Sequence, residues 1–396
     1  MASVRVLLAC VLLSAPVPLL GCAASSPSTA ASRPATVGQP TATSPVVEAP
    51  TTYVTPTDAA TMAELFERAR AALQQGRFSE AAASFDRLVT LEPQGTHASA
   101  SLFNAGIAYE AIEDRTSALA RFHEVVRSHP QAPEVHAALV RAMRILVYQE
   151  QWTELTATAD HLLAFAQLAP IERIEAHGCR ALGAVAQGDL EAASSHVARA
   201  RTLLEDHRLD DGGRLPVAAA SAFFALGETR RLRGEKIVFV PVPAAFAQVL
   251  EDRCQLLLDA QDAYATAMRS QDAHWAAMSG YRVGQLYQQL HRDVLVIPPP
   301  STATTDKQRQ LFEGAMRLRY RVLVEKGLTM MERVLRLAER TGEHSAWVSR
   351  AREARDELQG ALAQEKEALA KLPFSEADLK RALDDLSKKS GARTSP

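Results

Sequence analysis

The sequence is poor in cysteine, in aromatic residues and in net charge, and each shortage narrows what the protein can be. Its 396 residues include four cysteines and 6% aromatic residues, and the formal net charge is −2. Nucleic-acid binding needs a clustered excess of lysine and arginine, so we expect no nucleic-acid partner. The sequence also lacks nucleophile motifs, phosphate-binding glycine loops, dinucleotide fingerprints and zinc-ligand spacings. It therefore predicts no catalytic site, no metal and no cofactor.

The apolar run at the N-terminus is too short to cross a bilayer. It extends from Val6 to Leu20 after the positive charge of Arg5, roughly 15 residues where a spanning helix needs about 20. A charged start, a short apolar core and a small residue before a cleavage point are typical of a secretory signal peptide. We predict such a segment over residues 1–21.

The end of this run, Leu19-Leu20-Gly21-Cys22, resembles the lipobox of bacterial lipoproteins. The resemblance implies cleavage between Gly21 and Cys22, and acylation of the Cys22 thiol and of the new amine. Several acyl chains on one cysteine make a durable membrane anchor. Ala23 stands where an inner-membrane retention signal would have Asp, which favours the periplasmic face of the outer membrane; inner-membrane sorting stays open. An ordinary signal peptide or a buried amphipathic N-terminal segment is the alternative.

Residues 22–60 form the next predicted segment, a disordered linker behind the lipidated cysteine. Ala, Ser, Thr and Pro account for 28 of the 38 residues over 23–60. So little apolar bulk cannot offset the entropy of ordering, and the segment is expected to act as a tether. Cys10 leaves with the signal, so only Cys179 and Cys254 remain in the body. They are either a disulfide or two buried small side chains.

Two stretches further on share a pattern. GRFSEAAASFDRLVTLEP (76–93) and DRTSALARFHEVVRSHP (114–130) carry the same four residue types at a spacing of 37 residues. These positions are an alanine, an aromatic, an aliphatic and a proline: Ala81 and Ala118, Phe85 and Phe122, Leu88 and Val125, Pro93 and Pro130. The pattern is similar to the second helix of the tetratricopeptide repeat, and LFNAGIAYEA (102–111) to its first helix.

The resemblance implies an all-α fold, a tetratricopeptide-type helix–turn–helix solenoid wound as a right-handed superhelix. Small residues such as Gly106 and Ala118 would face each other where two helices cross. We place the repeats at 61–205, degenerate repeats at 206–372, and a last helix and tail at 373–396. A capping box at Thr61–Glu64 is expected to open the first helix. An alanine-rich helical protein without repeats is the alternative.

Two β-branched, proline-bounded stretches interrupt the helical pattern, KIVFVPVP (236–243) and RDVLVIPPP (292–300). We expect extended insertions there, either as a two-stranded ribbon between 238–240 and 294–296 or as loops along the solenoid edge. Their polyproline character also leaves partner docking open. Long helices should occupy 246–269, 272–291 and 307–340.

Three polar clusters suit more than one role. Glu205-Asp206-His207 with Asp210-Asp211 suits either a divalent ion or, more simply, a solvated loop. Arg317, Arg319 and Arg321 suit either anionic headgroups or a solvated helix surface. His291-Arg292-Asp293 resembles a kinase triplet, but Pro298 stands where the metal-binding Asn belongs and no glycine-rich loop precedes it.

The solenoid resemblance also implies a concave groove lined by first helices, which is how such proteins bind extended partners. Family groove positions fall on six residues: Phe66, Arg70, Phe103, Asn104, Arg141 and Arg144. Of the five positions that grip a terminal carboxylate in some relatives, only Asn104 and Arg141 match. Arginine and phenylalanine still suit an extended peptide. Exposed polar side chains without a binding role are the alternative.

We therefore expect a non-catalytic, lipid-anchored scaffold that binds periplasmic or outer-membrane proteins or peptides. Tetratricopeptide lipoproteins include factors for envelope assembly, secretion and gliding motility, and the late insertions faintly resemble the gliding-motility members. An enzyme, or an enzyme's regulatory subunit, acting on peptidoglycan is the alternative. A cytosolic co-chaperone is a third class, which the lipobox disfavours.

Overall fold

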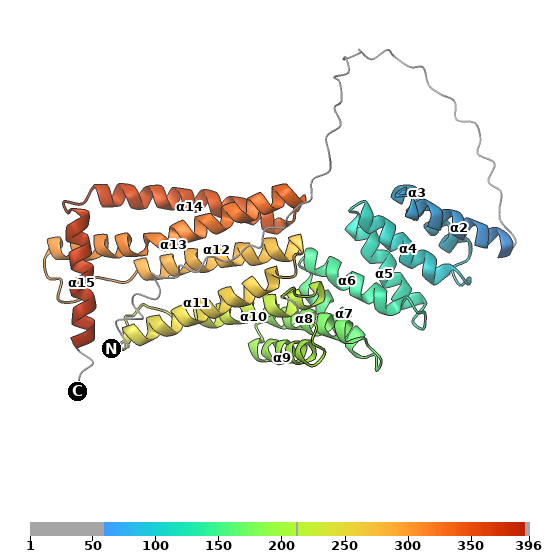
Figure 1. Cartoon of the computed structure of the whole chain (residues 1–396), viewed down its shortest axis with the longest axis horizontal. Helices are drawn as coiled ribbons and strands as arrows, with labels where there is room; N and C mark the ends of the chain where they lie inside the picture. Colours follow the sequence, from blue (N-terminus) through green and yellow to red (C-terminus); the bar gives the residue numbers. More distant parts are fainter. Residues whose placement is uncertain (1–58, 211–212, 393–396) are drawn as a thin grey trace, which may run out of the picture.

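The computed structural model describes residues 59–210 and 213–392, and every regular element in these residues is a helix. The predicted signal segment, Gly21, Cys22 and the linker up to residue 58 lie outside the described residues. From α2 to α14, each helix packs against the next one along the chain (Figure 1). The first six helices are short: α2 (Ala59–Gln74), α3 (Phe78–Leu91), α4 (Ala98–Ala111), α5 (Arg115–Ser128), α6 (Val135–Tyr148) and α7 (Trp152–Leu163).

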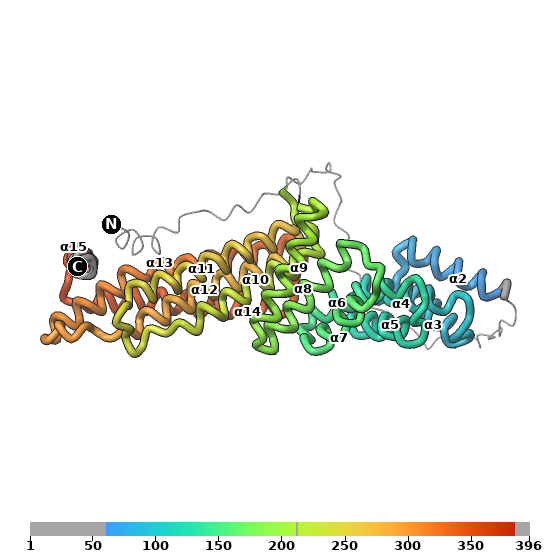
Figure 2. Tube along the Cα trace, turned by 90° about the horizontal axis from the view of Figure 1, so that it is seen from below, coloured from blue at the N-terminus to red at the C-terminus, as the bar shows by residue number. Residues whose placement is uncertain are grey.

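The later helices are longer and give the molecule its elongated outline, seen from the side in Figure 2. They are α8 (Pro170–Ala186), α9 (Leu190–Asp206), α10 (Val217–Glu235), α11 (Phe246–Met268), α12 (Ala273–Leu295), α13 (Asp306–Thr341), α14 (Ala346–Ala370) and α15 (Glu376–Ala392). Helices α10 to α14 lie lengthwise, and α15 stands across their far end (Figure 1). No described helix combines the length and the apolar content that a membrane crossing requires.

The first eight helices form four pairs, α2–α3, α4–α5, α6–α7 and α8–α9, and the turn inside each pair confirms the repeat period. Each has one residue with positive φ, at Gly76 (75°), Glu113 (62°), Glu150 (57°) and Gly188 (80°). The spacing of these four positions is 37 or 38 residues, as the sequence pattern predicts. After two of them an aspartate caps the second helix, because Asp114 accepts the backbone N–H of Ser117 and Asp189 that of Ala192. The chain is thus a tetratricopeptide-type helical repeat protein.

Small residues do lie where paired helices cross. A Cβ on Gly106 of α4 would come within 2.5 Å of the Phe122 ring on α5. Ala81, Ala118, Phe85 and Phe122 are all fully buried. Glycine and alanine let the backbones approach, and the aromatic rings fill the space that remains.

The predicted start of the first helix is wrong, whereas the predicted ranges of two long helices are confirmed. Thr61 lies inside α2, which begins at Ala59, so the capping box at Thr61–Glu64 is wrong. At the start of the last helix, the backbone N–H of Ser375 donates to Asp378 Oδ2 (2.9 Å) and that of Asp378 to Ser375 Oγ (3.2 Å), which is the capping arrangement. Helices α11 and α13 match the predicted ranges closely.

The second predicted insertion begins too early. Helix α12 continues to Leu295, and Val296 still has helical backbone angles (φ −83°, ψ −2°), so only residues 297–300 of the predicted insertion lie outside helix and turn. Val294 is completely buried in the core, and that packing outweighs the weak strand preference of a β-branched residue. The ribbon between 238–240 and 294–296 is therefore wrong, and no strand occurs in the described residues.

The first insertion is an extended loop, as predicted, between α10 and α11. Phe239 is buried and packs against Phe246 with ring centroids 5.7 Å apart. Val238, Val240 and Val242 remain exposed.

One hydrophobic core continues across the expected limit at residue 205. It contains Leu102 and Phe122 in the early pairs and Tyr264 and Trp347 in the long helices. Cys179 is buried and free, so it forms no disulfide with Cys254. Burial raises the pKa of its thiol well above the ordinary value, and the thiol stays neutral.

Candidate interaction surface

The six predicted groove residues all lie on the first helices of the first three pairs. Phe66 and Arg70 are on α2, Phe103 and Asn104 are on α4, and Arg141 and Arg144 are on α6. The period of the repeat places them in corresponding rows, as expected for first helices that line one side of a solenoid.

The two phenylalanines, Phe66 and Phe103, are half-buried, and each packs against another aromatic ring. The Phe66 ring meets Phe85 edge-on at 5.8 Å between centroids and stacks on His97 at 4.7 Å. Phe103 packs against Phe122 at 5.7 Å. Each ring is thus fixed by the second helix of its own pair and keeps part of its face accessible.

The two α6 arginines are ion-paired with neighbouring first helices. Arg141 Nη1 lies 2.5 Å from Glu110 Oε2 on α4, and the Arg141 guanidinium also lies over the Phe103 ring at 5.9 Å. Arg144 makes a bidentate contact with Glu175 on α8, at 2.6 and 2.9 Å. These pairs link α4 to α6 and α6 to α8.

The pairing changes the electrostatic character of this surface. The hydrogen bonds from Arg144 to the nearly buried Glu175 raise the pKa of the Arg144 guanidinium, which remains charged. Both positive charges are therefore compensated by carboxylates of the chain itself. Arg70 pairs with Glu67 on its own helix at 2.7 Å, with both side chains exposed.

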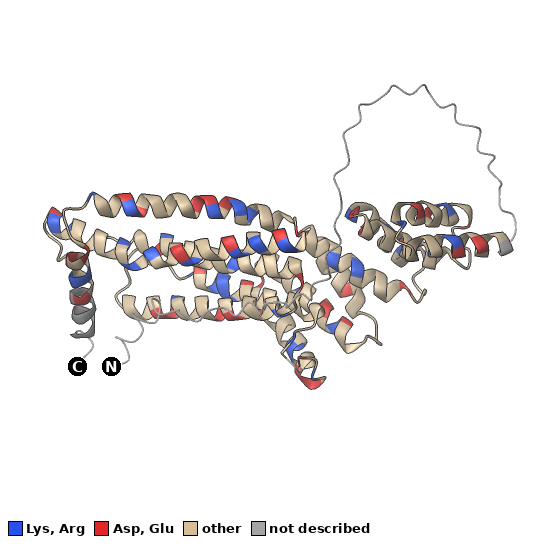
Figure 3. Cartoon of the chain, turned by 45° about the horizontal axis from the view of Figure 1, so that its top comes forward, with Lys and Arg blue, Asp and Glu red and all other residues tan. Residues whose placement is uncertain are grey.

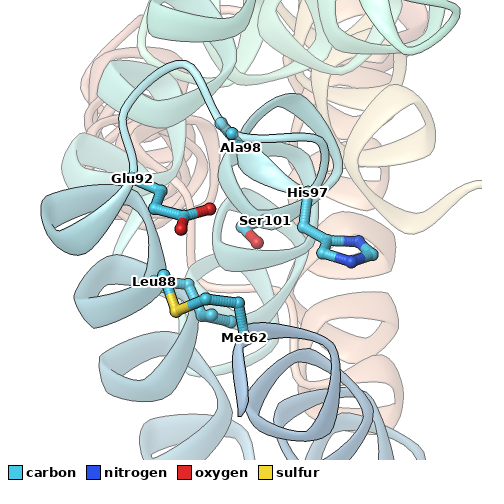
Figure 4. Close-up of a pocket in the computed structure, with 7 residues that line it drawn as sticks. Met62, Leu88, Glu92, His97, Ala98 and Ser101 are labelled. Carbon is cyan, nitrogen blue, oxygen red and sulfur yellow. The ribbon is translucent and has the colours of Figure 1, made fainter. Parts of the chain in front are cut away.

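The cavity beside Phe66 is too small for a ligand. It is lined by residues of α2, α3, α4 and the loop between α3 and α4, and it has a volume of about 10 Å³. Figure 4 shows the Glu92 carboxylate facing Ser101, while the His97 ring points to the other side. The space is about that of a single water molecule.

Comparison with known families singles out the same part of the chain. Residues 58–177 match the family model described as YfiO, outer membrane lipoprotein. The match covers α2 to α7 and the first turns of α8, and so includes all six groove residues. No curated protein matches the chain. The segment with the best-formed repeats is thus similar to a family of outer membrane lipoproteins.

Solved structures with this kind of architecture also match. A tetratricopeptide repeat protein from Parabacteroides merdae ATCC 43184 is 14% identical, with a TM-score of 0.41 over 76% of this chain and 100% of that chain. The tetratricopeptide domain of P58(IPK) is 12% identical, with a TM-score of 0.24 over 77% of this chain and 99% of that one.

A cluster around a deeply buried carboxylate in the long helices escaped the sequence analysis. Glu228 on α10 is almost completely buried and lies 2.8 Å from both Arg231 and Arg282, and Tyr264 donates to it at 2.5 Å. Burial raises the pKa of Glu228, but the two guanidinium groups outweigh this effect and hold it below its ordinary value. The cluster joins α10, α11 and α12. Tyr264 and Arg282 are far from Glu228 in the sequence, so no local pattern indicates that they meet it.

The polar clusters found in the sequence are held apart by the fold. Each member of the kinase-like triplet has its own partner: His291 lies 3.8 Å from Glu365, Arg292 3.1 Å from Glu357, and Asp293 3.2 Å from the buried Arg253. These contacts join α12 to α11 and α14.

The arginines of α13 also have separate surroundings. Arg317 pairs with Glu365 at 2.8 Å, Arg319 lies 5.5 Å from the Tyr320 ring centroid, and Arg321 pairs with Glu325 at 3.2 Å. Figure 3 shows segments of both charge signs interspersed along the ribbon of the long helices.

The acidic loop after α9 gives no metal centre in the part that the structure covers. Within residues 59–210 and 213–392, no group of three His, Cys, Asp or Glu side chains is arranged to hold a metal ion. Asp211, one of the five candidate ligands, lies outside these residues.

Proposed function

We propose that the chain is a non-catalytic scaffold, tethered to the outer membrane through lipid on Cys22, that binds other polypeptides in the periplasm. Three features support this proposal: the lipobox-like LLGC, the match of residues 58–177 to outer membrane lipoproteins, and the row of aromatic and arginine side chains on α2, α4 and α6. Repeat solenoids act mainly through such extended surfaces.

The observation that carries the proposal is the arrangement of Phe103, Arg141 and Glu110. Arg141 uses one N–H on Glu110, and its remaining donors stay available because the side chain is 37% exposed. The Phe103 face beneath it supplies apolar contact. A compensated guanidinium above an aromatic ring suits the carbonyl groups of an extended polypeptide better than a free terminal carboxylate, because the Glu110 charge opposes a second anion.

Charge exchange tests this surface without loss of the fold. Arg141→Glu places two carboxylates together and is expected to abolish co-purification of the partner from detergent-solubilised envelopes. The double exchange Glu110→Arg with Arg141→Glu restores the ion pair in reverse, so it should restore stability but not partner binding. Arg127→Glu, on the exposed side of α5, is the matched control and should leave binding unchanged. Unchanged partners in the double exchange would contradict a role for this surface.

The anchor is tested separately by incorporation of labelled palmitate. Cys22→Ala is expected to lose the label and to release the protein from membranes, whereas Cys10→Ala should keep both properties. Palmitate incorporation in Cys22→Ala would refute the anchor and leave the interaction surface to be judged by its own experiment.

A further inference from the structure

A cavity of about 280 Å³ lies between the end of α11, the first half of α12 and the C-terminal part of α13. It is separate from the first-helix surface on α2, α4 and α6. Its apolar lining includes Met268, Met330 and Val334, and the last two are nearly completely buried. Methionine side chains adapt to apolar groups of different shapes. The volume is close to the lower limit for small-molecule sites, about 300 Å³, so the cavity suits a small group or part of an alkyl chain.

Three arginines of α13 form the polar part of the lining: Arg333, Arg336 and Arg340. Their spacing of three and four residues places them on one face of the helix. Among the described residues, no carboxylate forms an ion pair with these three guanidinium groups, whereas Arg317 of the same helix is ion-paired. Arg333 Nη1 contacts the Met330 sulfur at 4.0 Å. The cavity therefore has a positive side that favours an anionic group.

Within the described residues, the lining offers side-chain donors but no strong side-chain acceptor. Its polar side chains are all arginines, and arginine has five N–H donors and no acceptor. Glu332 and Glu339, also in this part of α13, do not line the cavity. A bound peptide would leave backbone N–H groups without acceptors, and this is costly. A ligand with acceptors at one end and an alkyl chain at the other satisfies the whole lining.

The number of arginines indicates the head group of such a ligand. A phosphate monoester has three acceptor oxygens and about −1.5 to −2 charges at pH 7, so three guanidinium groups can share it. A carboxylate has two oxygens and a single charge. We propose that this cavity binds the terminal phosphate and part of the acyl chain of an anionic lipid. The inference relies on the proposed membrane tether only for the supply of lipid.

A short-chain probe tests the cavity on the full-length chain by isothermal titration calorimetry. Octyl phosphate, which stays monomeric in water, should bind with a Kd of about 0.1–1 mM, as befits a ligand of its size. Inorganic phosphate and 1-octanol each carry one half of this ligand and should bind at least about tenfold more weakly. Octanoate, with its single charge, should bind at least about threefold more weakly. Equal binding of any of these compounds, or no binding of octyl phosphate, would overturn the proposal.

Substitutions locate the binding. Arg336→Gln with Arg340→Gln removes two exposed charges and Ala276→Phe adds bulk to the lining, and each should weaken octyl phosphate binding about tenfold or more. Arg199→Gln with Arg352→Gln removes the same charge from exposed positions outside the cavity and should have no effect. Equal affinity in the double-arginine variant and its control would overturn the proposal. Full affinity in Ala276→Phe would do so as well.

An acidic polypeptide is the competing occupant, and Nα-acetyl-leucyl-aspartate N-methylamide represents it. This compound should bind at least about tenfold more weakly than octyl phosphate, because its amide N–H groups find no acceptor. Binding as tight as that of octyl phosphate would overturn the assignment to a lipid. Arg141→Glu, in the first-helix surface, should bind octyl phosphate normally, so failure of that surface and failure of this cavity are distinguishable.

Discussion

Glu113 has a left-handed backbone conformation at the turn between α4 and α5, and its carboxylate lies 2.9 Å from Nε2 of His344. The next pair repeats the relationship, because Glu150 has φ 57° and lies 2.7 Å from Arg350. His344 and Arg350 belong to the turn before α14 and to its first turns. The start of α14 is thus joined to the turns of the second and third pairs. In the first and fourth pairs, the left-handed turn position is a glycine instead, Gly76 and Gly188.

Substitutions at these turns should show the cost of the left-handed conformation. Gly188→Ala is expected to lower the free energy of unfolding by about 1 kcal/mol, although a Cβ there meets no atom within 4 Å. Glu113→Gly relieves the conformation but loses an exposed ion pair, so the net change should be about 0.5 kcal/mol or less. Urea-induced unfolding measures both. No effect of Gly188→Ala would contradict the turn geometry.

Helices α4 and α5 cross so closely at Gly106 that adding a single methyl group there should destabilise the fold. Gly106→Ala brings a methyl group to 2.5 Å from the buried Phe122 ring and should destabilise the chain by about 1–3 kcal/mol. A methyl group on Gly360, inside α14, would meet no atom within 4 Å, so Gly360→Ala should stabilise by about 0.5–1 kcal/mol. Thermal unfolding of both variants tests this prediction. Stability changes of the same sign in the two variants would contradict the close packing of α4 on α5.

Glu228 should be the most sensitive charge in the long helices. Glu228→Gln leaves Arg282 without its buried counter-charge and Arg231 with only the partly exposed Glu235, and it is expected to cost about 3–5 kcal/mol. Glu67→Gln removes the same charge from the exposed pair with Arg70 and should cost less than about 1 kcal/mol. Denaturant unfolding compares the two variants directly. Similar effects would mean that the Glu228 cluster is not desolvated.

The acid stability of the fold should depend on Glu343, in the turn before α14. Burial raises the pKa of this carboxyl, but hydrogen bonds from His274 and Ser345 outweigh burial and lower it to about 2. A carboxyl whose pKa is lower in the folded state than in the unfolded state stabilises the fold at pH values above its ordinary pKa of 4.5. This stabilisation is lost as the pH falls toward about 2.

Glu343→Gln removes that titration. Its free energy of unfolding should fall less between pH 4.5 and pH 2 than that of the unaltered chain. Glu339→Gln, at an exposed position near the end of α13, should keep the full decrease. Parallel pH profiles for the unaltered chain and Glu343→Gln would refute this role.

Local patterns in the sequence were sufficient for the repeat pairs. In each unit, the small residue, the aromatic residue and the proline lie within about forty residues of the residues that they contact. The patterns over α3 and α5 therefore predict both the helices and their packing. The same periodicity placed Phe66, Phe103 and Arg141 on first helices. What it could not show is the partner of Arg141, because Glu110 belongs to another repeat.

Long-range packing accounts for the expectations that were wrong. Val294 is β-branched and close to prolines, which favours an extended segment, but its burial between the long helices keeps it in α12. Glu228, Tyr264 and Arg282 meet only after three helices have packed together. Such contacts leave no signal in any short stretch of sequence.

Site-specific photo-crosslinking in intact cells tests the central claim most directly, that the first-helix surface holds another polypeptide. A photoreactive amino acid replaces Asn104 on α4 in one variant and Arg127 on α5 in the other. Our account predicts a discrete crosslinked adduct from position 104 that disappears in Arg141→Glu, and none from position 127. The same adduct from both positions, or no adduct from position 104, would contradict it.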